Sequence, residues 1–176
     1  MSVAHTWGTS AAERALPCPC DGFVERIDLA CWRGVTVCAD AATLFRWLCQ
    51  LRAAPYSYDW IDNLGRRSPR TLTPGLDRLE LGQRAMTIFE LVAFERDRQL
   101  TLRTRRFAPG LSPVVAVSYL VHPLGAREAR LLAKLAVQVR PGPLGALAKA
   151  VLPWADLVMM RRQLLNLKAL AEGRGA

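Results

Sequence analysis

The chain has 176 residues, of which 51% are hydrophobic, and its 24 lysines and arginines against 15 acidic residues give a formal net charge of +9. This length suits one domain with a sizeable core, and no apolar run approaches the about 20 residues that a transmembrane helix needs. The charge favours an anionic partner but does not choose between nucleic acid, acidic lipid and an anionic metabolite.

Residues 1–22 are rich in small and turn-forming residues and show no sustained period. We therefore expect a loosely ordered leader there, followed by one domain over residues 23–176. The N-terminus lacks a basic stretch followed by an apolar block, so no secretory signal is indicated and we expect a cytoplasmic protein.

The five cysteines are an odd number and lack C-x-x-C spacing. Cys31, Cys38 and Cys49 lie in apolar stretches, so we expect reduced thiols in the core. Cys18 and Cys20 have one residue between them and no histidines nearby, which gives little support for a zinc site. We expect no metal and no other cofactor.

The first two regular elements are predicted between residues 23 and 50. Alternation and β-branched residues over Phe23–Val37 predict a strand, in which Gly34 could mark a bulge. Asp40 is placed to cap a helix that runs to Gln50.

Pro55 ends that helix and suits the first turn of another. The spacing of Tyr56, Trp60 and Leu64 then predicts a short second helix with these three residues on one face. Gly65 is placed to end it.

Four further stretches are rich in β-branched or aromatic residues or alternate in polarity, with turn signals between them. They are Arg84–Glu95, Gln99–Phe107, Pro113–His122 and Glu128–Arg140. Their spacing predicts an antiparallel meander with one cationic, solvated face and one dry face.

The segment Leu144–Ala171 repeats apolar residues at intervals of three and four, which predicts a long amphipathic helix. Pro153 lies inside this pattern and should kink or restart it. Such a helix would cover the dry face of the sheet, so the predicted architecture is α+β.

Three stretches add a resemblance to this pattern: VTVCADAATLFRWLCQLRAAPYSYDWIDNLGRRSPR, LTPGLDRLELGQ and PWADLVMMRRQLLNLKALAE. With the order of the elements, they resemble the START-like (SRPBCC) superfamily, and within it polyketide cyclase or dehydrase-like members, over about Ala30–Glu172. The resemblance implies a helix-grip fold, in which a curved antiparallel sheet wraps around a long C-terminal helix. It also implies a cavity between sheet and helix that binds a hydrophobic molecule.

Aromatic and apolar side chains on the elements that would border this cavity are the candidate ligand contacts. The alternative for the aromatic residues is that they pack the second helix onto the sheet. The candidate pocket residues are Tyr56, Tyr58, Trp60, Leu102, Thr104, Tyr119, Leu135, Leu157, Met160 and Leu164.

Glu90 is the candidate catalytic residue, because it lies in a strand where a charge is costly unless it faces water or has a partner. The alternative is a place on the solvated face opposite Arg103 or Arg105. Asp59 and Asp62 also offer an acid and a base, although a surface ion pair is the commoner role for such residues.

The leading hypothesis is a protein that binds a hydrophobic or aromatic small molecule, polyketide-like or lipid-like, with or without catalysing its cyclisation or dehydration. The alternatives are a carrier or ligand-responsive protein, and a basic surface that binds anionic membrane or nucleic acid. We expect no specific nucleic-acid binding, because the arginines of RTRRF lack interleaved stacking aromatics. A homodimer is left open.

Overall fold

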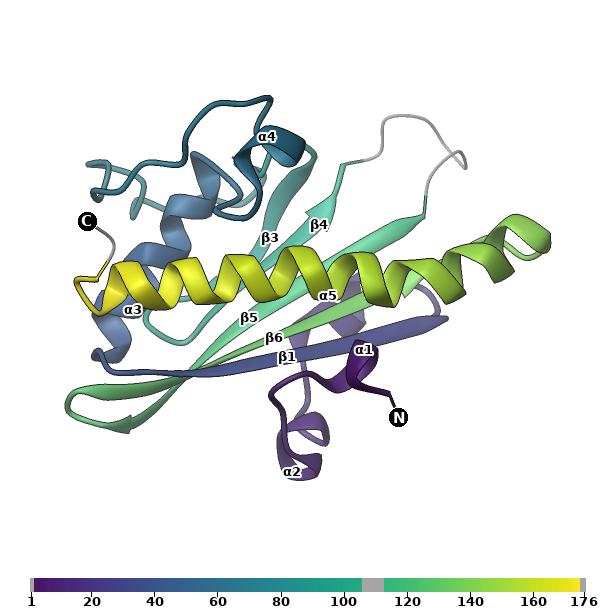
Figure 1. Cartoon of the computed structure of the whole chain (residues 1–176), viewed down its shortest axis with the longest axis horizontal. Coiled ribbons are helices and arrows are strands. Elements are labelled where there is room, and N and C mark those ends of the chain that lie inside the picture. Colours follow the sequence, from purple (N-terminus) through teal and green to yellow (C-terminus); the bar gives the residue numbers. More distant parts are fainter. Residues whose placement is uncertain (1, 106–112, 175–176) are drawn as a thin grey trace.

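A computed structural model describes residues 2–105 and 113–174 of the chain. One sheet and one long helix dominate it (Figure 1). The helices are α1 (Val3–Thr6), α2 (Ala11–Arg14), η1 (Pro19–Phe23), α3 (Ala41–Cys49), η2 (Gln50–Arg52), α4 (Asp59–Asp62) and α5 (Pro143–Ala171). The strands are β1 (Leu29–Val37), β2 (Arg84–Ala85), β3 (Phe89–Glu95), β4 (Gln99–Thr104), β5 (Val114–Gly125) and β6 (Glu128–Gln138).

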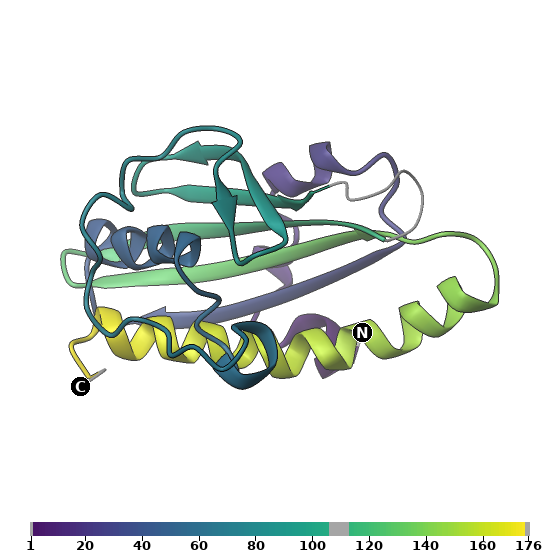
Figure 2. The same ribbon diagram turned by 90° about the horizontal axis from the view of Figure 1, so that it is seen from above.

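The six strands form a single antiparallel sheet in the order β1-β6-β5-β4-β3-β2. The sheet curves, and α5 lies along its concave side (Figure 2). The main core fills the space between the sheet, α3 and α5, with Leu44, Leu91 and Leu164 among its buried side chains. The predicted α+β architecture and antiparallel meander are confirmed.

The first strand is shorter than predicted and contains no bulge. β1 begins at Leu29, and Gly34 pairs with Leu132 in an unbroken register with β6. Glycine is needed here for a different reason, because a Cβ on Gly34 would lie 2.9 Å from the carbonyl oxygen of Gly8. The missing side chain lets the N-terminal segment cross β1 at close range.

The predicted strand Arg84–Glu95 is divided into β2 and β3 by a tight reversal. Met86 and Thr87 have φ angles of 44° and 66°, in the left-handed region, and the chain turns back there. The alternation pattern did not reveal this turn because neither residue is a usual turn former. Residues 106 and 107 of the predicted strand Gln99–Phe107 lie outside the described residues.

The helix predicted after Pro55 is reduced to the single turn α4. Tyr56 has a φ of 56° and cannot belong to a right-handed helix. Tyr56 is therefore buried while Trp60 and Leu64 are 75% and 86% exposed, so the prediction that the three share one face is wrong. Gly65, with its N–H donating to the carbonyl of Asp59, does end the turn as expected.

The predicted C-terminal helix is confirmed as α5. It continues through Pro153 without a break, so the expectation that the helix could restart there is wrong. Its second half presents Met160, Leu164 and Leu167 to the core. By length and composition alone α5 is able to cross a membrane. In the structure it instead packs along the sheet as the covering helix of the fold (Figure 2).

The N-terminal segment differs from the expected loosely ordered leader. Its described part forms α1, α2 and η1, and both Ala4 and Cys20 are fully buried. The Glu13 carboxylate accepts from Arg130 Nε at 2.7 Å, which ties α2 to β6. This segment therefore contributes to the packing on both sides of the sheet.

All five cysteines are free thiols. Cys31 and Cys49 are buried as predicted, but Cys38 is exposed at the end of β1, so its assignment to the core is wrong.

Candidate functional site

A cavity of about 380 Å³ lies between the concave side of the sheet and α5. Most of its wall is apolar, supplied by β5, β6, the reversal after β2 and the middle of α5. The lining residues are Pro55, Ser57, Asp62, Leu64, Met86, Thr87, Ile88, Phe89, Val117, Tyr119, Leu135, Asp156, Met159, Met160 and Gln163. The volume falls within the range of about 300–1,000 Å³ that is usual for small-molecule sites.

Two neutral polar side chains are fixed in this wall by each other. The hydroxyl of Tyr119 on β5 donates to Gln163 Oε1 on α5 at 2.6 Å, and Gln163 Nε2 donates to the carbonyl of Pro55 at 2.6 Å. Burial raises the pKa of the Tyr119 phenol, so the group stays neutral. The pair links sheet, helix and the segment before α4 at the cavity wall.

Asp156 places a carboxyl group in the cavity from α5. Its Oδ2 accepts from Arg33 Nη2 at 2.6 Å, and the Arg33 side chain is 1% exposed. Arg33 also donates to the carbonyls of Ala4, Trp32 and Pro153. The guanidinium therefore has backbone partners of its own and does not depend on Asp156 alone.

Burial raises the pKa of Asp156 to about 6, although Arg33 acts in the opposite direction. Desolvation disfavours the ionised carboxylate more strongly than the neighbouring cation favours it. A carboxyl group with a pKa near neutrality exchanges a proton readily under working conditions, which is the property that general acid–base catalysis requires.

A second acid, Asp62, also lines the cavity. Its Oδ1 is buried and has no hydrogen-bond partner among the described residues, and burial raises its pKa. Asp59, three residues earlier, instead accepts from the backbone N–H and hydroxyl of Ser68. The two aspartates thus have different surroundings, and only Asp62 borders the cavity.

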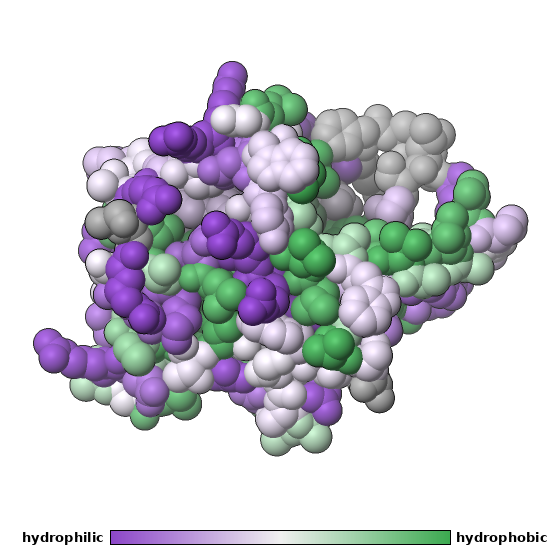
Figure 3. Space-filling model, in the orientation of Figure 1, coloured by the Kyte–Doolittle hydropathy of each residue, from purple (hydrophilic) through white to green (hydrophobic). Residues whose placement is uncertain are grey.

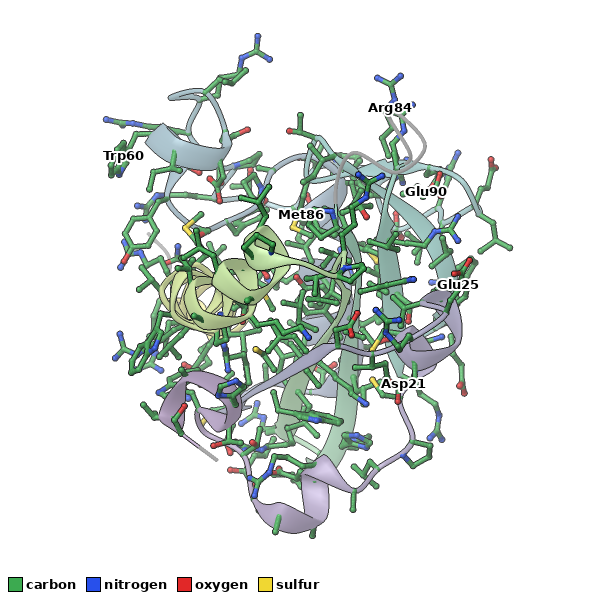
Figure 4. The ribbon with its side chains drawn as sticks, turned by 90° about the vertical axis from the view of Figure 1, so that its right-hand side faces the viewer. Asp21, Glu25, Trp60, Arg84, Met86 and Glu90 are labelled. Atoms are coloured by element: carbon green, nitrogen blue, oxygen red, sulfur yellow. The ribbon has the colours of Figure 1, made fainter. Side chains whose placement is uncertain are left out.

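Three of the candidate pocket residues, Tyr119, Leu135 and Met160, line this cavity. The other seven do not line it. Tyr56 packs edge-on against Trp47, and the ring of Tyr58 lies under Arg162. Trp60 is exposed, Leu157 is half-buried on α5, Leu102 and Leu164 are in the core, and the Thr104 hydroxyl accepts from the Val115 N–H. Figure 4 shows Met86 next to α5, whereas Trp60 points away from the sheet.

Glu90 does not line the cavity. Its Oε1 accepts from Arg103 Nη2 at 3.1 Å, and both side chains are about one-third exposed. Figure 4 shows Glu90 on the side of the sheet that faces away from α5. The structure therefore places Glu90 in the surface ion pair that was the alternative to a catalytic role.

The sequence analysis missed Asp156, Arg33 and Gln163 as site residues. The available signal was that Asp156 is the one acidic residue in the apolar stretch from Leu144 to Ala171. Within the parts of the chain that the structure describes, no group of three or more histidine, cysteine or acidic side chains is arranged to hold a metal ion.

No family model matches the sequence, and no curated protein matches it. Solved structures do match. A hypothetical protein from Helicobacter pylori is 18% identical with a TM-score of 0.60, covering 89% of this chain and 96% of its own. A protein from Chromobacterium violaceum is 13% identical with a TM-score of 0.51, covering 81% of this chain and 96% of its own.

A third solved structure, the di-domain ARO/CYC StfQ from the steffimycin biosynthetic pathway, is 15% identical with a TM-score of 0.54. The match covers 82% of this chain and 51% of that protein, about one of its two domains. At these identities the likeness shows the fold, and it agrees with the sheet and helix described above.

Proposed function

We propose that this chain, which has the START-like (SRPBCC) helix-grip fold, binds a hydrophobic or aromatic small molecule in the cavity between the sheet and α5. The observation that carries the proposal is the cavity itself, with apolar walls and a few polar groups that point into it. The same fold in an ARO/CYC protein supports a polyketide-like ligand, and the lining suits a lipid-like one equally well.

The polar groups of the cavity define the preferred chemistry of the ligand. Burial raises the pKa of both Asp156 and Asp62, so each binds a proton more readily than a solvated carboxyl group does and can donate a hydrogen bond when protonated. An uncharged ligand with carbonyl or hydroxyl oxygens would accept these bonds, whereas an anionic ligand would raise the cost of ionising either acid. The net charge of +9 therefore does not predict an anionic ligand for this cavity.

If the protein is an enzyme, Asp156 is the residue that we propose for proton transfer. Its carboxylate would remove a proton from a carbon between two carbonyl groups, and the resulting enolate would add to another carbonyl of the same chain. Asp156 would then return the proton to the new alkoxide. The cavity contributes by holding the chain folded, with the reacting carbons close together.

A carrier would use the same walls without proton transfer, and substituting Asp156 separates the two roles. In an enzyme, Asp156→Asn keeps ligand affinity and loses about 100-fold or more of turnover of a poly-β-ketone analogue. In a carrier, no turnover is observed for either protein. The free thiols of all five cysteines support a cytoplasmic setting for either role.

Ligand binding itself is tested by filling the cavity. Met159 lines it, so Met159→Trp should abolish the binding of an apolar fluorescent probe or of a polyketide analogue. The matched control is Val158→Trp, because Val158 is the adjacent residue on α5 and is 54% exposed. Equal probe binding by both variants would contradict the cavity as the ligand site.

A further inference from the structure

A second apolar surface lies along the first half of α5 and beside α4. We call it the exposed apolar face. It consists of Trp60, Ile61, Leu64, Leu144, Leu147, Val151, Trp154 and Val158, each at least 51% exposed. Figure 3 shows hydrophobic surface along this part of α5 and near α4 on the same side of the molecule.

The α5 members of this face follow helical spacing. Leu144, Leu147, Val151, Trp154 and Val158 succeed one another at intervals of three and four, so they form one stripe along the helix. The side chains that α5 buries are different ones, including Pro153, Met160 and Leu164. A helix that covers a sheet normally has a polar outer side, whereas this second stripe is apolar and is exposed with respect to residues 2–105 and 113–174, which the structure describes.

The charges around the stripe indicate what partner it fits. On α5, Lys149 is paired with Asp28 and Lys168 with Glu172, and the one acid of the helix, Asp156, is bound to Arg33 in the cavity wall. Arg161 and Arg162 follow the stripe and have no carboxylate partner among the described residues. A second copy of the chain would bring these cations against one another. An anionic surface would neutralise them.

We propose that the exposed apolar face docks on the surface of an anionic phospholipid membrane. Apolar side chains enter the boundary between headgroups and acyl chains, two tryptophans take the interfacial position that this side chain prefers, and the cations contact lipid phosphates. The helix lies on the membrane and does not cross it, because its other side is packed on the sheet.

This docking does not depend on the proposed ligand, but it has a consequence for the cavity. Leu64 belongs to the exposed apolar face and also lines the cavity. Ile88, another residue that lines the cavity, is 46% exposed. The cavity therefore opens next to the docking surface. A lipid-like molecule would pass between bilayer and cavity with little exposure to water.

The test is sedimentation of the full chain with vesicles. Vesicles of phosphatidylcholine alone are compared with vesicles that contain about one-third phosphatidylglycerol. We expect binding to the anionic vesicles only, weakening as salt rises from low to physiological strength. Leu147→Ala combined with Trp154→Ala should weaken binding about tenfold or more, because both side chains lose apolar contact with lipid.

The matched control is Leu81→Ala combined with Leu124→Ala, which removes two exposed apolar side chains outside the face and should leave binding unchanged. All four residues are exposed, so circular dichroism should show intact folding in both double variants. Equal binding to neutral vesicles, no binding to anionic vesicles, or equal loss in both variants would overturn the proposal. So would a solution mass of twice 19.5 kDa that the face variant returns to 19.5 kDa, since a second copy would then cover the face.

Discussion

Replacing Asp156 by Asn tests which of two opposed effects determines the pKa of this buried carboxyl group. Pairing with Arg33 at 2.6 Å favours the carboxylate, and burial disfavours it. Removing one partner of a buried ion pair often costs about 3–5 kcal/mol, which would make Asp156→Asn strongly destabilising at neutral pH. Arg33, however, keeps its three carbonyl partners in the variant.

The raised pKa of Asp156 gives the opposite expectation for the pH dependence. The difference between its ordinary value of 3.8 and about 6 corresponds to about 3 kcal/mol, at about 1.36 kcal/mol per pH unit. The folded chain binds this proton more tightly than the unfolded chain does. The contribution of Asp156 to the free energy of unfolding is therefore fully present below about pH 4 and is lost as the pH rises to about 6.

The assay is urea unfolding of wild type and Asp156→Asn at several pH values between about 4 and 7. Subtracting the free energy of unfolding of one protein from that of the other cancels the contribution of every other titrating acid. We expect the variant to gain up to about 3 kcal/mol relative to wild type across this window. A relative loss of stability by the variant as the pH rises would refute the reasoning, since it would mean that Arg33 lowers the Asp156 pKa below its ordinary value.

Three other substitutions test particular contacts. Glu13→Gln should lower the free energy of unfolding by about 1–2 kcal/mol at neutral pH, because Arg130 holds the pKa of Glu13 at about 2. Urea titrations should show that this difference from wild type disappears as the pH falls from about 4.5 to about 2. Gly34→Ala should cost about 1–3 kcal/mol, because its Cβ would lie 2.9 Å from the backbone carbonyl oxygen of Gly8, and an unchanged Tm would contradict that close approach. Glu90→Gln should change stability by less than about 1 kcal/mol and leave probe binding intact, whereas lost binding would place Glu90 in the site.

Local signals in the sequence predicted the elements that depend on local chemistry. The Asp40 cap is one case, since its Oδ1 accepts from the Thr43 N–H at 2.8 Å. The apolar intervals of the C-terminal segment are another, because they placed Met160 and Leu164 toward the sheet. Where hydrophobic period and capping agree, one sequence is enough to predict helix, strand and layer.

The remainder depends on contacts between distant residues. Asp156 gains its raised pKa from burial and from Arg33, which is 123 residues earlier in the chain. Tyr56 adopts its left-handed backbone in a buried setting next to Trp47, and no residue around it is a glycine that would announce such a turn. The N-terminal helices have too few residues to form alone, and side-chain partners on the sheet hold them in place.

The central claim is that the cavity between the sheet and α5 holds an apolar molecule, and native mass spectrometry of the purified protein tests it most directly. We expect a mass above that of the 19.5 kDa chain in the native spectrum, and the loss of this extra mass on denaturation with release of a hydrophobic compound into solvent. Met159→Trp should carry none of this mass, and Val158→Trp should carry it in full. A bound compound that Met159→Trp retains, or wild-type protein that takes up no polyketide-like or lipid-like molecule when these are added, would contradict the account.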